Sequence, residues 1–88
     1  MDAALKKKLR AQAHSLNPVI MIGQAGLTEA VLAETEIALN THELIKVKIR
    51  AERDERKQIT EKICAETGAS LVQSIGQIAV IHRLNPKK

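Results

Sequence analysis

A short loop flanked by glycines is the first feature of this sequence that could do chemistry. The apolar run Val19–Ile22 ends in the loop Gly23–Gly26, which reads GQAG, and Thr28 is a suitable N-cap for a helix that follows. The first N–H groups of a helix lack partners and carry partial positive charge, so a glycine loop there can bring bare amides up to a phosphate. The same two glycines also suit an ordinary tight turn. The loop alone leaves both interpretations open.

A strand with one cationic face is the second feature. The segment LIKVKIR, residues 44–50, alternates between apolar and basic side chains, which is typical of a strand with one buried face. Lys46, Lys48 and Arg50 then point to the same side at intervals of about 6–7 Å. This interval is comparable to the distance between consecutive phosphates, although a plainly solvated sheet face would have the same pattern. Further basic residues that could enlarge this surface are Lys6, Lys7, Lys8 and Arg10 near the N-terminus and Arg83 near the C-terminus.

Catalytic and metal-binding patterns are not recognisable in this sequence. Cys64 is expected in the middle of a helix as a half-buried structural thiol, and the three histidines fall on separate elements without the spacing of metal ligands. The GQAG loop lacks the glycine-lysine-Ser/Thr ending of a nucleotide-binding P-loop. We therefore expect no enzyme, no catalytic residue, no metal site, no cofactor and no small-molecule substrate.

Composition favours a polyanionic partner. The 88 residues include 14 Lys and Arg against 10 acidic residues, a net charge of +4, and the length predicts one domain over residues 1–88. Phe, Tyr and Trp are absent, so the aromatic platforms on which many RNA-binding modules stack bases are excluded. A single cysteine and the lack of a signal-peptide or membrane-spanning pattern predict a cytoplasmic protein without a membrane partner. No spare apolar stripe is evident, which favours a monomer.

The elements that must position these residues follow from periodicity and capping. We expect helices over 2–16, from about 28 to 40 and from 54 to 67, with Asp2, Thr28 and Asp54 as N-caps and Gly68 as a C-terminal stop. Expected strands cover 19–22, which is taken as buried, then 44–50, 70–75 and 78–83. The last two are joined by Gly76-Gln77 in a type II′ turn. The order α-β-α-β-α-β-β predicts a compact α/β fold in which a four-stranded mixed sheet packs with helices. Residues from about 85 are expected to fray.

Three motifs in register resemble a known family. The series is AHSLNP at Ala13–Pro18, IGQAGLT at Ile22–Thr28 and HELIKVK at His42–Lys48, followed by ETGA at Glu66–Ala69. Together they resemble the CRM domain (chloroplast RNA splicing and ribosome maturation), most closely the small stand-alone bacterial members of the YhbY type. The resemblance runs from about residue 9 to residue 82.

The resemblance implies both a fold and a function. Members are RNA-binding modules whose fold is similar to the C-terminal domain of a translation initiation factor, and their GxxG loop is compared with the loop of KH domains that clamps a nucleic-acid backbone. The stand-alone bacterial members are regarded as assembly factors for the precursor large (50S) ribosomal subunit. His82 stands where members often carry an aromatic residue, which would weaken stacking at that edge. The RNA-binding residues expected from the resemblance and the basic inventory are Gly23, Gln24, Ala25, Gly26, Lys46, Lys48, Arg50, Arg83, Lys6, Lys7 and Arg10.

Two other functions stay open beside ribosomal RNA binding. One is a non-catalytic adaptor that docks on a ribosomal protein or another assembly factor, with its charges serving solubility. The other is an enzyme that acts on RNA, against which the lack of a catalytic constellation speaks. If phosphate contacts dominate, binding should depend strongly on salt and be selective mainly for RNA shape.

Overall fold

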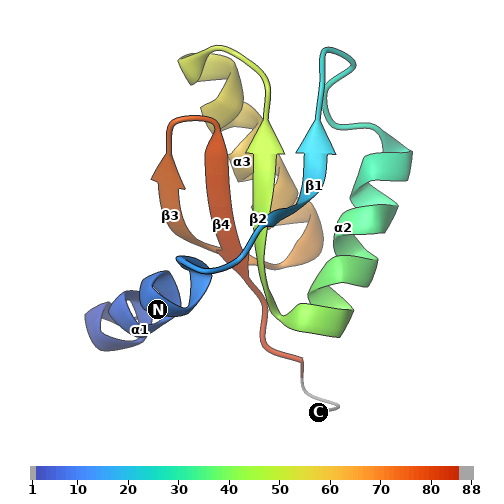
Figure 1. Ribbon diagram of the computed structural model, residues 1–88. Helices are drawn as coiled ribbons and strands as arrows, with labels where there is room; N and C mark the ends of the chain where they lie inside the picture. Colours follow the sequence, from blue (N-terminus) through green and yellow to red (C-terminus); the bar gives the residue numbers. More distant parts are fainter. Residues whose placement is uncertain (1, 86–88) are drawn as a thin grey trace.

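Helices and strands alternate along the chain until a hairpin ends it. The computed structural model describes residues 2–85, and Figure 1 shows their arrangement. The elements are α1 (Ala3–Ala13), β1 (Pro18–Ile22), α2 (Glu29–His42), β2 (Leu44–Ile49), α3 (Arg53–Thr67), β3 (Ser70–Ile75) and β4 (Ile78–His82). Within the described residues, the predicted order of three helices and four strands is therefore confirmed.

The four strands form one mixed sheet in the order β1-β2-β4-β3. β1 and β2 run parallel and are connected by α2, because a parallel pair needs a crossover, whereas the other neighbouring strands pair antiparallel. α1 lies against one face of the sheet, and α2 and α3 cover the other (Figure 1). We call these the α1 face and the α2/α3 face.

Strand alternation divides the buried side chains between the two faces. Ile45, Val47 and Ile49 of β2 point to the α2/α3 face, where they pack in a cluster with Leu39 of α2 and Ile63 of α3. The α1 face has a smaller cluster, whose buried members are Leu9, Ala13, Leu44, Val72 and Val80. The larger core holds the crossover helices, and the smaller core attaches α1 to β2, β3 and β4.

Most of the predicted helix ends are confirmed. The Asp2 carboxylate accepts a hydrogen bond from the Leu5 N–H at 2.7 Å, and the Thr28 hydroxyl accepts one from the Val31 N–H at 3.2 Å. Gly68 ends α3 with a φ of +75°, a left-handed conformation that glycine adopts without strain. Gly76 also has a positive φ and begins the β3–β4 turn, as a type II′ turn requires.

Two expectations about element ends are wrong. Asp54 does not cap α3, because the helix begins at Arg53 and the capping position falls on Glu52, whose side chain makes no capping hydrogen bond. α1 ends at Ala13 rather than at residue 16. The side-chain amide of Asn85 donates a hydrogen bond to the Asn40 carbonyl at 2.9 Å, and the expected fraying from about residue 85 stays a prediction. The rest of the predicted frayed tail, 86–88, lies outside the described residues.

The first strand is half-buried rather than buried. Ile20 and Ile22 are inside the core of the α2/α3 face, but Val19 and Met21 are 51% and 57% exposed. β1 is an edge strand, and α1 does not extend over it. An all-apolar run of four residues therefore contributes apolar surface to solvent on the α1 face, which sequence periodicity alone did not separate from a fully buried strand.

Candidate nucleic-acid interface

The α1 face carries a row of side chains that crosses all four strands. Met21 of β1 pairs with Lys48 of β2, Lys48 pairs with Ile78 of β4, and Ile78 pairs with Ile75 of β3. Cross-strand partners point to the same side of a sheet, so these four side chains are neighbours. Ile75 is 62% exposed and Met21 is nearly as open, which shows that α1 leaves this row accessible. Lys48 therefore stands in an apolar and solvent-facing row.

An open hollow of about 650 Å³ lies where α1 meets this face. Its formally charged lining residues are Lys7 and Arg10 of α1 and Lys46 of β2, and all three are cations. The remaining lining residues are Ala11, Ala13, His14, Gln73, Ile75, Ile78 and Val80. The hollow thus brings together basic residues about forty positions apart in sequence, which the sequence could only name as separate groups.

The GQAG loop forms a tight turn at one end of the sheet. The Gly26 N–H donates a hydrogen bond to the Gly23 carbonyl at 3.0 Å, and Gly26 has a φ of +74°, where a side chain would be strained. Gln24 and Ala25 at the tip are exposed. Arg50 lies beside the loop, since its N–H donates to the carbonyl of Ile22 at 2.9 Å. The loop and the end of β2 therefore share the upper end of the sheet in Figure 1.

These positions place the predicted basic strand and the loop along one path. Arg50 adjoins the loop, Lys48 and Lys46 follow down β2, and the hollow below adds two cations from α1. We call this set the cationic track; its members are Lys7, Arg10, Lys46, Lys48 and Arg50. Both strand lysines are half-buried, so their stems pack on the sheet while their ammonium groups can stay in water.

The GQAG loop is separated from α2 as the predicted N-cap Thr28 requires. The GQAG turn does not open α2 directly, because α2 begins at Glu29 and two residues separate Gly26 from that position. The N-cap Thr28 already accepts a hydrogen bond from Val31, one of the helix N–H groups expected to await an anion. Glu29 also places a carboxylate in the first helical turn. One N–H group of this helix terminus is therefore already bonded, and the Glu29 carboxylate makes the terminus less favourable for an anion.

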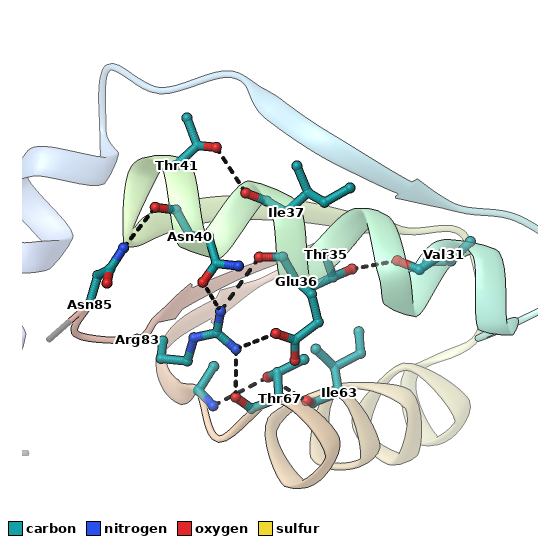
Figure 2. A network of polar contacts seen from close by, with 11 residues as sticks. Val31, Thr35, Glu36, Ile37, Asn40, Thr41, Ile63, Thr67, Arg83 and Asn85 are labelled. Atoms are coloured by element: carbon teal, nitrogen blue, oxygen red, sulfur yellow. Dashed lines mark hydrogen bonds and ion pairs between the residues drawn. The ribbon is translucent and has the colours of Figure 1, made fainter. Parts of the chain in front are cut away.

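Arg83 has a different position from the other predicted site residues. Its Nη1 donates to a carboxylate oxygen of Glu36 at 2.7 Å and to the Thr67 carbonyl at 2.9 Å, and its Nη2 donates to the Asn40 side chain at 2.8 Å (Figure 2). The Arg83 side chain is only 21% exposed. These contacts connect the end of β4 to α2 and α3, the helices of the opposite face. Arg83 is therefore engaged in tertiary structure, and we leave it outside the cationic track.

Two of the remaining α1 lysines lie outside the hollow. Lys6 and Lys8 are exposed, and neither is among the residues that line it. This distribution agrees with helical geometry, in which neighbouring residues point in different directions. Lys7 and Arg10, three positions apart, share a side of α1 and are the pair that reaches the sheet.

Sequence reasoning missed Gln73 and the two isoleucines of the hollow. The pairing of β3 with β4 shifts register between Leu71 and Gln73, which marks a β-bulge. Val72 is buried under α1, and its neighbour Gln73 lines the hollow on the same face. Strict alternation would have placed these two consecutive residues on opposite faces. The bulge leaves no signal in this sequence that would have revealed it.

Other candidate chemistry is limited in the described residues. Burial raises the pKa of the Cys64 thiol, which keeps it protonated and weakly nucleophilic. Within residues 2–85, no three His, Cys, Asp or Glu side chains are grouped so that they could hold a metal ion. Across the same residues, every helix is too short or too polar to span a bilayer.

Fold and site together define a small α/β binding domain with a cationic sheet face and an exposed glycine turn. The family described as the CRS1 / YhbY (CRM) domain matches residues 1–83, and the chain belongs to this family. The motif resemblance and the predicted fold class are thereby confirmed.

Relatives and a solved structure cover nearly the whole chain. A Pseudomonas aeruginosa protein named a probable RNA-binding protein is 52% identical over 83 residues, 93% of this chain and 80% of its own length. A Haemophilus influenzae protein named an RNA-binding protein is 54% identical over 79 residues, 89% of this chain and 80% of its own length. The solution structure of a Staphylococcus aureus protein, described as a candidate RNA-binding protein, has a TM-score of 0.85 and 32% identity. That match covers 97% of this chain and 90% of the other.

Proposed function

We propose that this protein binds RNA through the cationic track and the GQAG loop, without catalysing a reaction. The observation that carries the proposal is the hollow in which Lys7, Arg10 and Lys46 come together from two elements. The names of the Pseudomonas and Haemophilus relatives support RNA as the partner. Family membership and these names also favour a binding role over an enzymatic one.

Phosphate contacts provide most of the affinity in this mechanism. The five cations of the track and the amides of the loop together offer about 4–6 phosphate contacts. Each contact releases a counterion, so the affinity for RNA should fall by roughly two to three decades between 50 and 200 mM salt. Because no aromatic residue is present to stack on bases, shape and phosphate spacing should dominate selectivity.

The RNA target we propose is ribosomal RNA of the precursor large subunit, where the protein would act as an assembly factor in the cytoplasm. This target rests on the three motifs shared with stand-alone bacterial members of the family. Crosslinking of the protein to RNA in cells, followed by mapping of the crosslinked positions, tests it. Enrichment on precursor large-subunit RNA is the expected result, and enrichment on unrelated RNA would contradict the proposed target.

The loop is tested by placing negative charge at its tip. Gln24→Asp with Ala25→Asp adds two carboxylates at the exposed positions of the turn and should weaken ribosomal RNA binding by about tenfold or more, because they repel phosphates. Gln58→Asp with Ala65→Asp is the matched control, since both residues are exposed on α3 and the net charge becomes the same. A filter-binding titration compares the affinities, and circular dichroism confirms folding. Unchanged affinity in the loop variant would remove the loop from the mechanism.

A protein-binding adaptor is the second candidate. The exposed apolar side chains of Val19 and Met21 on the edge strand β1 favour it, since such residues can contact a partner protein. Salt-insensitive binding to a purified ribosomal protein, without binding to naked ribosomal RNA, would support the adaptor against the RNA-binding proposal.

A further inference from the structure

The hollow on the α1 face has two kinds of surface in one place. Two of its aliphatic lining residues, the exposed Ile75 and the half-buried Ile78, face the hollow from the sheet, and we call this pair its floor; Lys7, Arg10 and Lys46 supply positive charge around it. Phosphate binding alone explains the cations but gives no use for an apolar floor that remains open to solvent. The occupant with matching chemistry has a flat apolar surface attached to negative charge.

We propose that this hollow holds an unstacked base of single-stranded RNA, with the phosphates on either side of that base bound by the surrounding cations. An RNA base offers an apolar face of the kind that an aliphatic floor can cover, and its sugar-phosphate links carry the negative charge. This inference rests on the proposed RNA-binding function and deepens it. Phosphate contacts alone do not distinguish an RNA with bases from a sugar-phosphate backbone without them.

Size and charge both fit this occupant. The volume of about 650 Å³ lies within the range of small-ligand pockets, roughly 300–1,000 Å³. The formally charged residues that line the hollow, Lys7, Arg10 and Lys46, are all positive, which suits a nucleotide better than an uncharged apolar segment of a protein. Charge complementarity therefore favours a nucleotide as the occupant.

Gln73 adds a group that can read the edge of a base. Its side-chain amide has both donors and an acceptor, so it can hydrogen-bond to an exposed base edge. The β-bulge of β3 brings Gln73 to the hollow beside the buried Val72. Bulges commonly redirect a side chain in this way. The aliphatic floor would contact the face of the base, and the hydrogen bonds of Gln73 would orient the edge of the base.

The test separates bases from phosphates. Two fluorescein-labelled eight-nucleotide RNAs are compared by fluorescence anisotropy at 50 mM salt: one is oligouridine, and the other has an abasic ribose at every internal position. Both carry the same number of phosphates. The wild-type protein should bind oligouridine about fivefold more tightly, a smaller preference than an aromatic platform gives.

A substitution in the floor tests whether the hollow causes the preference for oligouridine over the abasic RNA. Ile75→Ser should bring the ratio of the two affinities close to one, and folding should survive because Ile75 is 62% exposed. Ile37→Ser is the matched control, since Ile37 is 67% exposed on α2 and lies outside the hollow. It should keep the wild-type ratio. Gln73→Leu should lower the ratio by removing the amide.

The outcomes distinguish failure of the base-binding hollow from failure of the proposed RNA-binding function. Equal and salt-dependent binding of both RNAs by the wild-type protein would overturn the base-binding hollow and leave the proposed RNA-binding function standing. A wild-type preference that Ile75→Ser leaves unchanged would also overturn the assignment to the hollow. Absence of binding to either short RNA, with ribosomal RNA still bound, would overturn the base-binding hollow alone, whereas absence of binding to ribosomal RNA as well would contradict the proposed function itself.

Discussion

The two faces of the sheet use their side chains in opposite ways. On the α2/α3 face, Val47 and Leu39 are completely buried, and the charged side chain of Arg83 is held by three neighbouring residues. On the α1 face, a single helix covers part of the sheet and leaves Lys48 and Ile75 in contact with solvent. One face is therefore built for stability, whereas the other has cations and apolar atoms available to a ligand.

This contrast also separates two kinds of basic residue. Lys46 lies on β2 and Arg83 directly follows the neighbouring strand β4, and composition counts both simply as cations. Arg83 has a carboxylate partner at 2.7 Å and donates to backbone and amide oxygens, so its positive charge is already compensated. Lys46 lines a hollow in which the other charged residues are also cations. The surroundings of a cation, rather than its charge, determine whether it can serve a polyanion.

The largest expected effect is on the buried face. Leu39→Ala truncates a fully buried side chain of α2 and should lower the free energy of unfolding by about 2–5 kcal/mol. The removed atoms no longer contribute their transfer free energy, and the residues around the cavity lose van der Waals contacts. Ile37→Ala on the same helix should change it by less than about 0.5 kcal/mol, because Ile37 is exposed. Urea unfolding followed by circular dichroism measures both. Equal effects of the two substitutions would show that α2 does not pack as described.

Arg83→Ala should have the next largest effect on stability. It leaves Glu36, Asn40 and the Thr67 carbonyl without their guanidinium donor, and the expected loss is about 1–3 kcal/mol. The affinity for RNA, measured at a temperature where the variant is folded, should stay within about twofold of wild type. A tenfold loss of RNA affinity in the folded variant would break the distinction between the two faces.

Substitutions in the cationic track should lower the affinity for RNA and leave stability nearly unchanged. Lys46→Gln with Lys48→Gln should change the free energy of unfolding by less than about 0.5 kcal/mol, because both side chains are partly solvated. RNA affinity at 100 mM salt should fall by about tenfold or more, and the log–log salt slope should become shallower by about 1.5–2 as two phosphate contacts are lost.

The control for the track has the same loss of charge elsewhere. Lys57→Gln with Lys62→Gln removes two exposed lysines of α3, on the other side of the sheet. Its affinity should fall far less than that of the track variant, and its salt slope should stay close to wild type. If both pairs weaken binding equally, overall charge rather than the α1 face would account for the affinity.

Local sequence signals predicted most of the fold because they act within a few residues. The alternation in 44–50 identified β2 and assigned its side chains to the two faces correctly. Asp2, Thr28 and Gly68 were recognised as caps because each bonds to, or ends, the helix next to it. The prediction that Asp54 caps α3 was wrong because acidic residues stand on both sides of the helix start. Glu52 takes the N-cap position, and Asp54 belongs to the first turn of the helix.

The candidate site was less predictable because it depends on long-range geometry. Arg83 is bonded to Glu36, which lies 47 positions away in the sequence, and no local sequence pattern predicts this pair. The hollow requires the packing of α1 on β2, β3 and β4, together with the bulge that brings Gln73 beside Val72. The sequence could name Lys7 and Lys46 as basic, but only the fold brings them together.

The central claim is that RNA contacts the α1 face and the GQAG loop. Titration of isotope-labelled protein with the eight-nucleotide oligouridine, followed by amide chemical shifts in NMR spectra, tests it directly. The largest shifts are expected at the loop Gly23–Gly26, along β2 from Lys46 to Arg50, and at Lys7 and Arg10 of α1. Shifts concentrated on α2 and α3, with the loop and β2 unchanged, would contradict the account.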